Sequence, residues 1–249
     1  MDSKEKFTHK VENYVKYRPA YPQELISYLT EELGLSVNSV VADVGAGTGI
    51  FTKLLADKAK VIYAVEPNAN MRAACERYCA GLEHVTVVDG GAEETGLPDR
   101  SVDFITSAQA FHWFDRNQTK PEFQRILKHG GKVILVWNSR VAEDELVQES
   151  DQLCRRYCTA FDGFSGGSSM DSNDYHHFFK ECDYRTFENN ITYTLDSYIG
   201  NSLSASYAPN ENDPNYQAYI EALTELFHKY SVRGELLMPN KTHSYAGEV

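Results

Sequence analysis

Short apolar runs and amphipathic stretches alternate along the first 140 residues of the chain. The runs are rich in Val and Ile and only five to seven residues long, which is typical of strands buried in a parallel sheet. Between them, apolar residues recur three or four positions apart, as on the buried face of a helix. The alternation predicts an α/β fold. The predicted strands are 40–44, 61–66, 85–89, about 101–107 and 132–137, and the predicted helices are 22–33, 49–58, 69–82 and about 115–129.

The pattern changes beyond residue 140. An amphipathic stretch with an acidic first half predicts a helix at 141–161. Alternating residues at 184–194 predict a strand, and two helical pieces follow at about 195–207 and 214–230. A last strand is predicted at 235–245, and the chain contains no internal repeat.

The first predicted strand carries an acid, Asp43, and breaks directly into the turn Gly45-Ala46-Gly47-Thr48-Gly49. Strand, glycine turn and helix together form the entrance of a nucleotide-type site, because glycine lets the backbone bend sharply and a ligand approach closely. A dinucleotide fingerprint reads G-x-G-x-x-G, whereas this spacing is G-x-G-x-G. The Asp43 carboxylate would repel a pyrophosphate. It suits a ligand with a positive end, such as S-adenosylmethionine (SAM).

A second acid, Glu66, closes the next predicted strand about twenty residues after the first glycine. A carboxylate at that strand tip can accept hydrogen bonds from both ribose hydroxyls of a nucleoside. An ordinary βαβ unit with a Gly-rich turn would explain the glycines alone. The two acids and the strand–turn–helix context favour a SAM site.

The segments VADVGAGTGIFTKLLA, VIYAVEPNANM and GGAEETGLPDRSVDFITSAQAFHWFD resemble the class I SAM-dependent methyltransferases, and among them the type 11 methyltransferase-domain group. The resemblance covers about 40–136 and extends loosely to the segment Tyr-x-x-Tyr-Arg-Pro-x-Tyr-Pro near the N-terminus. It implies one domain over 1–249, with a Rossmann-like, seven-stranded, mostly parallel sheet, an antiparallel last strand and helices on both faces. It also implies a helical cap at about 195–230 between the sixth and seventh strands. The N-terminal segment 1–22 is either a lid, since such segments often cover the cofactor in this family, or a stretch whose aromatic rings dock on the domain surface.

In the resembling family, the corner after the third strand binds adenine. The backbone N–H of Ala92 would contact one ring nitrogen, and a carboxylate would accept from the exocyclic amine. Many members carry Asp where this chain has Gly91, so Glu93 takes that role or it stays unfilled. The expected cofactor-binding residues are Asp43, Gly45, Ala46, Gly47, Glu66, Pro67, Met71, Ala92, Glu93 and Gln109.

The loop after the predicted strand at 101–107 offers His112 and Trp113 to the acceptor side, since open α/β sheets keep their sites at the carboxyl ends of strands. His112 is either a general base or a residue that orders this loop. A carboxylate acceptor would need a positive clamp rather than a base, and Arg18 or Arg140 fits that role. The expected acceptor-side residues are Tyr14, Tyr17, Arg18, Trp113, Asn138, Arg140 and Tyr207.

The composition of the chain argues against some classes of binding partner. The 249 residues carry a formal net charge of −12, which disfavours DNA or RNA as a partner. No apolar run approaches the ~18–20 residues that span a bilayer, and MDSKEKFTHK lacks the apolar core of a signal peptide, so a cytoplasmic protein without membrane contact is expected. The five cysteines are then expected to be reduced and to bind no metal. The sequence leaves the oligomeric state open.

These features favour a SAM-dependent methyltransferase with a small-molecule acceptor. A carboxylate of that acceptor is one candidate for the methylated group. Two alternatives remain open at this stage. The protein could methylate protein or RNA, which an open, basic cleft would favour, or it could bind SAM as a sensor without transfer, which a blocked acceptor side would favour. An NAD(P) dehydrogenase is disfavoured by Asp43 and by the glycine spacing.

Overall fold

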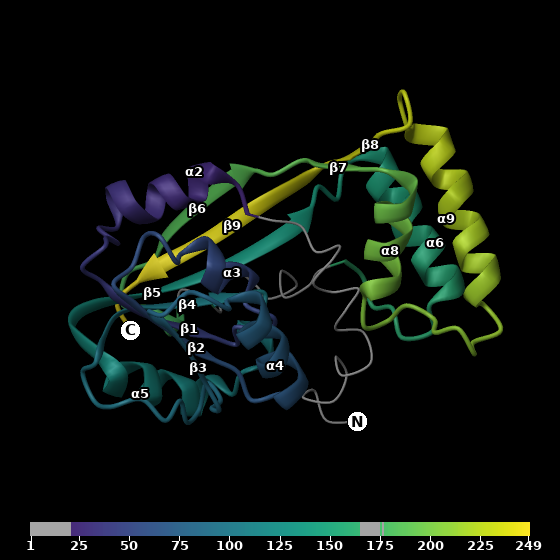
Figure 1. Ribbon diagram of the computed structural model, residues 1–249. Helices are drawn as coiled ribbons and strands as arrows, with labels where there is room; N and C mark the ends of the chain where they lie inside the picture. The colour runs from purple at the N-terminus through teal and green to yellow at the C-terminus, as the bar shows by residue number, and fades with distance from the viewer. Residues whose placement is uncertain (1–20, 165–174, 176) are drawn as a thin grey trace.

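The computed structural model describes residues 21–164, 175 and 177–249, and its centre is a seven-stranded sheet (Figure 1). The strand order is β3-β2-β1-β4-β5-β9-β6, and only β9 runs antiparallel to its two neighbours. The mostly parallel sheet with an antiparallel last strand is therefore confirmed. Its strands are β1 (Val40–Val44), β2 (Val61–Val65), β3 (Val85–Val88), β4 (Val102–Ala108), β5 (Leu127–Arg140), β6 (Asp183–Glu188) and β9 (Asn240–Gly247).

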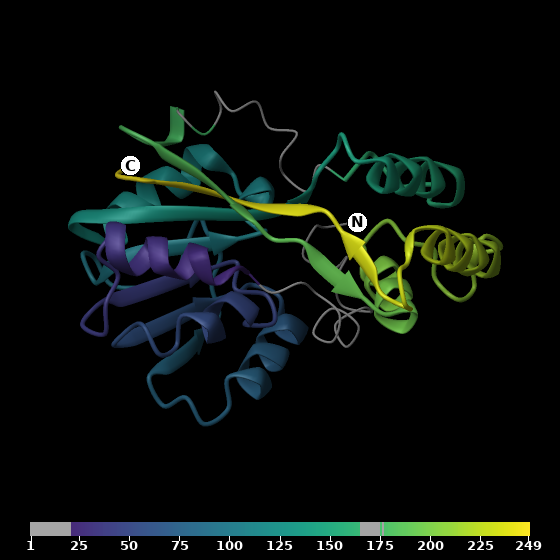
Figure 2. The same ribbon diagram turned by 90° about the horizontal axis from the view of Figure 1, so that it is seen from above.

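Helices cover both faces of this sheet, as predicted (Figures 1 and 2). One face buries apolar side chains of the N-terminal helices around Val41, Ile62 and Val136. The other face packs against Phe123 and Ile126 of the helix that precedes β5, and against Phe178. The helices are α2 (Gln23–Ser27) with the π-helical turn η2 (Tyr28–Glu32), α3 (Ile50–Leu54), α4 (Ala69–Tyr78), the short 3-10 turn η3 (Phe111–Trp113) and α5 (Arg116–Ile126).

The two C-terminal strands expected at 184–194 and 235–245 are each split in the structure. The first divides into β6 and β7 (Ile191–Tyr193), and the second into β8 (Leu236–Met238) and β9. Pro239 lies at the break and has no N–H for a ladder hydrogen bond. Opposite it, the Asn190 side chain accepts from the Asn240 backbone N–H at 3.1 Å. The expectation of continuous strands was wrong because these residues end the pairing; β7 and β8 form a separate two-stranded ribbon.

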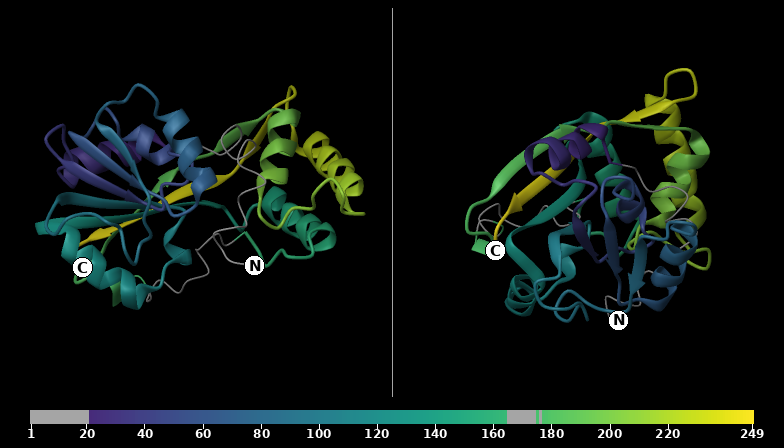
Figure 3. Two further views of the ribbon diagram at one scale, coloured as in Figure 1. Left: turned by 60° about the horizontal axis from the view of Figure 1, so that its bottom comes forward. Right: turned by 60° about the vertical axis from the view of Figure 1, so that its left-hand side comes forward.

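This ribbon joins the sheet to a group of helices beside the strands' carboxyl ends (Figure 1, right; Figure 3, left). α8 (Leu195–Ser204) and α9 (Tyr216–Tyr230) lie between the ribbon strands in the sequence, as the cap expectation requires. The structure adds a third helix, α6 (Glu145–Tyr157), which packs on α9 in one apolar cluster with Tyr198, Tyr219 and Phe227. We call α6, α8 and α9 the cap.

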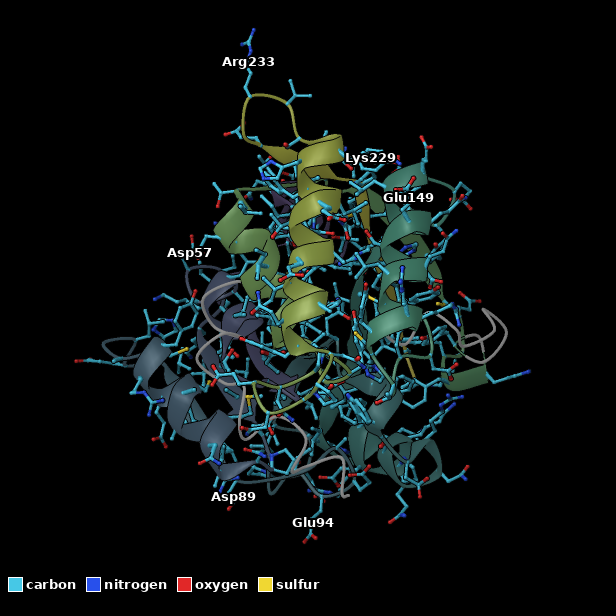
Figure 4. The ribbon with its side chains drawn as sticks, turned by 90° about the vertical axis from the view of Figure 1, so that its right-hand side faces the viewer. Asp57, Asp89, Glu94, Glu149, Lys229 and Arg233 are labelled. Atoms are coloured by element: carbon cyan, nitrogen blue, oxygen red, sulfur yellow. The ribbon has the colours of Figure 1, made fainter. Side chains whose placement is uncertain are left out.

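A polar contact joins α9 to α6 within the cap. Lys229 on α9 and Glu149 on α6 point toward one another in Figure 4, and Lys229 Nζ lies 2.5 Å from Glu149 Oε1. Tyr230 donates to the same carboxylate oxygen at 2.9 Å. Glu149, one of the acids in the acidic first half of the predicted helix at 141–161, therefore joins two cap helices. None of the described helices is long and apolar enough to cross a membrane.

Candidate active site

A cavity of about 550 Å³ lies between the carboxyl ends of the sheet strands and the cap. One wall comes from the glycine turn and from the ends of β2, β4 and β5. The other wall comes from Phe164, Tyr193, Ser202 and Tyr207. The volume falls in the range of about 300–1,000 Å³ that is typical of small-molecule sites. Two elements that are remote in sequence therefore enclose one site.

Asp43 lies at the bottom of this cavity, in the middle of the sheet. Its Oδ1 accepts from Thr106 Oγ1 at 2.9 Å, and its Oδ2 accepts from Thr52 Oγ1 at 2.5 Å. Burial raises the pKa of Asp43 to about 6, against the opposing effect of the two threonine hydrogen bonds. A buried carboxylate held in this way gains from a cationic ligand, since an opposite charge replaces lost solvation.

Glu66 stands directly after β2 and holds the glycine turn. Its Oε2 accepts from the Gly47 backbone N–H and its Oε1 from the Asn68 N–H, each at 2.9 Å. Each carboxylate oxygen has a further lone pair for a ligand hydroxyl. Burial raises the pKa of Glu66, against the effect of the two backbone donors. The carboxylate is thus positioned and still able to accept two hydroxyls.

The glycine turn fits a closely approaching ligand. Gly45 has φ +72°, and a Cβ added there would lie 2.5 Å from the Ala110 Cβ. Gly47 also has a positive φ, and its missing Cβ faces open space in the cavity wall. Thr48 has a buried hydroxyl with no hydrogen-bond partner in the described structure, and it also lines the cavity. A bare backbone and an unpaired polar atom are what a bound nucleoside would cover.

The remaining expected cofactor residues surround the same end of the cavity. Pro67, Met71 and Ala92 line it, and the Met71 and Ala92 side chains are buried. Glu93 lines it too, but its Oε1 accepts from the Asp115 backbone N–H at 2.8 Å and so holds the start of α5. Its role toward adenine stays a prediction.

Gln109 adopts an uncommon backbone conformation, with φ +58°. Its side chain donates to the Asn138 carbonyl at 3.0 Å, which ties the end of β4 to the end of β5. The Asn138 side-chain oxygen in turn accepts from Asn189 at 3.1 Å and from Thr242 at 2.5 Å. Both Gln109 and Asn138 line the cavity, and the Asn138 side chain also links the end of β5 to Asn189, between β6 and β7.

His112 and Trp113 form the loop between β4 and α5, with ring centroids 4.8 Å apart. Burial lowers the pKa of His112 to about 4, so the ring is neutral at physiological pH. Its Nδ1 is buried and has no partner in the described structure. Trp113 is 41% exposed. Both expected roles for His112, general base and loop-ordering residue, stay predictions.

Arg140 brings a positive charge to the cap side of the cavity. Its guanidinium carbon lies 3.9 Å from the centroid of the Phe164 ring, a close cation–π contact. Among residues 21–164, 175 and 177–249, no acidic side chain forms an ion pair with it. Tyr207, the other expected cap residue, lines the same cavity. The site therefore holds acids at the glycine turn and a cation at the cap.

Three expected residues, Tyr14, Tyr17 and Arg18, and with them most of the 1–22 lid segment, lie outside the described residues. The next residue of that aromatic motif, Tyr21, lines the cavity, and its ring meets Phe51 edge-on at 4.9 Å. No group of three or more His, Cys, Asp or Glu side chains that could hold a metal occurs in the described part of the chain.

Sequence reasoning did not find several residues around the cavity. Thr52 and Thr106, which hold Asp43, have no motif of their own, and only strand pairing brings Thr106 beside it. Ser139 also lines the cavity, between the expected residues Asn138 and Arg140 in the sequence, and has no motif of its own. Phe164 and Tyr193 come from the cap side, and no local pattern marks them.

Comparison with known proteins agrees with this geometry. Residues 42–135 match the family model of a methyltransferase domain. A Schizosaccharomyces pombe protein named as an uncharacterized methyltransferase-like protein is 33% identical over 152 residues, 61% of this chain and 58% of its own length. The chain thus matches less than two thirds of the length of the first curated relatives, 58% and 59%.

Solved structures share the fold over nearly the whole chain. A candidate type II methyltransferase from Anaeromyxobacter dehalogenans has a TM-score of 0.65 at 22% identity, covering 93% of this chain and 98% of its own. A candidate sarcosine dimethylglycine methyltransferase from Galdieria sulphuraria has a TM-score of 0.54 at 22% identity, covering 91% and 84%. At these identities the likeness shows a common fold.

Proposed function

We propose, on the premise that residues 42–135 belong to the SAM-dependent methyltransferase-domain family, that the protein transfers a methyl group to a small-molecule acceptor. The observation that carries this proposal is the charge arrangement of one cavity. Two buried carboxylates, Asp43 and Glu66, lie at the glycine turn, and the Arg140 guanidinium lies across the cavity beside the cap. The first pair suits a cationic nucleoside, and the arginine suits an anionic acceptor.

The cofactor supplies an electrophilic methyl group on a sulfonium, and the chain supplies binding, alignment and a dry site. Asp43 would balance the positive aminoacyl end and Glu66 would accept the ribose hydroxyls. Gly45, Ala46 and Gly47 would offer bare backbone. Pro67, Met71, Ala92 and Glu93 would surround the base, with Gln109 bracing the strand ends.

On the acceptor side, Arg140 would hold a carboxylate of the acceptor, either as an anchor or as the methylated group. Aromatic side chains around the cavity, including Trp113, Phe164, Tyr193 and Tyr207, suit a small organic acid better than a polymer. The cap and the net charge of −12 both disfavour an RNA chain at this site. The Galdieria neighbour is itself named for the small molecules sarcosine and dimethylglycine.

We also propose that the cap and the sheet act as a single domain. The cavity takes one wall from each, and the ribbon of β7 and β8 connects them without a separate linker. An acceptor enclosed in this way would be shielded from water, which strengthens its contacts with charged groups.

The test is methyl transfer from SAM labelled in the methyl group to a metabolite extract below about 1 kDa, alongside SAM calorimetry. Label in a low-mass product, lost in Asp43→Ala with the fold retained by circular dichroism, supports the proposal. Label only in added protein or RNA overturns the small-molecule acceptor. SAM binding without any transfer indicates a sensor, and binding only of a pyridine dinucleotide overturns the family premise for this site.

A further inference from the structure

A chain of two hydrogen bonds runs from the cavity wall to the surface. Ser139 Oγ lies 2.7 Å from His243 Nε2, and His243 Nδ1 lies 2.7 Å from Tyr184 Oη. Both nitrogens of the imidazole are therefore engaged, on opposite sides of the ring. Such two-sided contact fixes the orientation of a histidine and selects its tautomer.

The three residues come from three neighbouring strands. Ser139 is near the end of β5, next to Arg140, and lines the cavity. His243 is on the antiparallel strand β9, and Tyr184 is on the edge strand β6 and is 45% exposed. The contacts thus lead from the cavity across the edge of the sheet to solvent. The antiparallel pairing of β9 with β5 and with β6 sets the register in which the three residues meet.

The groups around His243 keep its ring neutral in the resting protein. Burial lowers the pKa of His243, and the positive charge of Lys241 on the same strand adds to this effect. Among the described residues, the other titratable group against the ring is Tyr184 from β6, which stacks on it with ring centroids 6.0 Å apart. Tyr245 from β9 lies behind Tyr184, with their ring centroids 4.7 Å apart in a tilted arrangement. A neutral ring with Nδ1–H donating to Tyr184 leaves Nε2 as an acceptor for the Ser139 hydroxyl.

We propose that Ser139, His243 and Tyr184 form a proton relay that deprotonates the acceptor, so that the methylated group is a hydroxyl or an amine rather than a carboxylate. The inference rests on the proposed function and deepens it. Arg140, one residue from Ser139, then holds the acceptor's carboxylate as an anchor and presents the O–H or N–H group to Ser139.

The proton and electron balance is complete without a further reactant. As the acceptor oxygen or nitrogen bonds to the methyl carbon, the sulfur–carbon electron pair remains on the departing thioether. The acceptor's proton passes to Ser139 Oγ, and the Ser139 proton passes to His243 Nε2. The imidazolium is stabilised by Tyr184 Oη and loses its proton to solvent. The products are the methylated acceptor, the neutral thioether and one proton.

His243 suits this task better than His112. Burial lowers the pKa of both rings, but the Nδ1 of His112 is buried and has no partner among the described residues. The His243 ring has an oxygen on each side, and Tyr184 provides an acceptor for the charged state. His112 then contributes a neutral hydrogen-bonding group at the same cavity.

The first test needs no acceptor. In protein labelled with ¹⁵N-histidine, NMR should show His243 as the neutral Nδ1–H tautomer above its pKa. Tyr184→Phe, at an exposed position, should lower that pKa further because the charged ring loses its acceptor. The Nε2–H tautomer, or a pKa unchanged in Tyr184→Phe, would overturn the relay.

The second test uses the labelled product from the metabolite extract. Mild alkali releases labelled methanol from a methyl ester but not from a methyl ether or methylamine. We expect the labelled product to be stable to alkali. In His243→Gln, we expect kcat at pH 7 to be lower by about 10²-fold or more, with KM nearly unchanged. The residual rate should then rise with pH where the wild-type rate is flat. His228→Gln, at an exposed position on α9, is the matched control and should keep wild-type kinetics.

The outcomes separate the two proposals. An alkali-labile ester, or a wild-type pH profile in His243→Gln, overturns the relay and leaves the methyltransferase proposal standing. SAM binding with no transfer to any acceptor overturns both. If His243→Gln does not fold, Ser139→Ala should show the same loss of kcat at pH 7.

Discussion

Thr106 Oγ1 donates to Asp43 Oδ1 at 2.9 Å between two neighbouring parallel strands, where the two residues are paired in register. This contact and the one from Thr52 orient a carboxylate that is otherwise fully buried. Its pKa, about 6, is above the ordinary value near 4, so the folded protein takes up a proton that the unfolded chain has lost. Asp43 therefore reduces the stability of the ligand-free protein as pH rises from about 4 to 6.

The first prediction concerns the pH dependence of SAM binding. A positive ligand end favours the ionised Asp43, so SAM affinity should rise by up to tenfold per pH unit below about pH 6 and level off above it. Asp43→Asn should bind SAM at least ~10-fold more weakly at pH 7.5 and lose most of this dependence. Calorimetry from pH 5 to 8 measures both. An equally steep profile in Asp43→Asn would show that another group titrates.

A second prediction concerns Glu66. Glu66→Gln should lower SAM affinity by ~10-fold or more, because a hydrogen bond to a charged group contributes about 1.5–3 kcal/mol. In addition, the NH₂ group of the new amide would face the backbone N–H of Gly47 or Asn68, where the carboxylate accepts a hydrogen bond. Glu76→Gln removes the same charge from an exposed position of α4 and is the matched control. Equal affinity of the two variants would remove Glu66 from the cofactor site.

A third prediction separates backbone strain from steric contact. Gly34 and Gly45 both have a positive φ, but a Cβ at Gly34 meets nothing within 4 Å, whereas one at Gly45 lies 2.5 Å from Ala110. Gly34→Ala should cost only about 1–2 kcal/mol of unfolding free energy, from the left-handed backbone. Gly45→Ala should cost more and should also weaken SAM binding, measured by urea unfolding and calorimetry. Similar losses in both variants would contradict a special role for the close approach at Gly45.

A fourth prediction concerns Arg140. Arg140→Gln should raise the acceptor KM by at least ~10-fold while leaving SAM affinity unchanged, since it removes the cation on the cap side alone. Arg155→Gln, an exposed arginine on α6 that pairs with Asp151, provides the control for lost charge. A change in SAM affinity with an unchanged acceptor KM would assign Arg140 to the cofactor instead.

The alternation of strands and helices, the glycine turn and the acid at the end of β2 were predictable from the sequence. β1 has the predicted bounds, and its strand, turn and helix follow from neighbours within a dozen residues. Local patterns of this kind depend on backbone preferences and on one buried face. The break at Pro239 also follows from the sequence, because proline is unsuited to a paired strand, and the predicted strand at 235–245 does not allow for it.

The partners of these residues were not predictable in the same way. Thr106 is 63 residues from Asp43, and His243 is 104 residues from Ser139. Helix α6 joins a cap whose other helices, α8 and α9, follow in the sequence only after β6 and β7. The sequence by itself determined the glycine turn and the two acids, because one continuous βαβ segment carries them. Only the tertiary structure decided the side of the cavity where we propose that the acceptor binds. Strand register and helix packing between distant segments place Arg140, Ser139 and the cap tyrosines. Register and packing in turn depend on how the whole chain buries its apolar surface rather than on any local pattern.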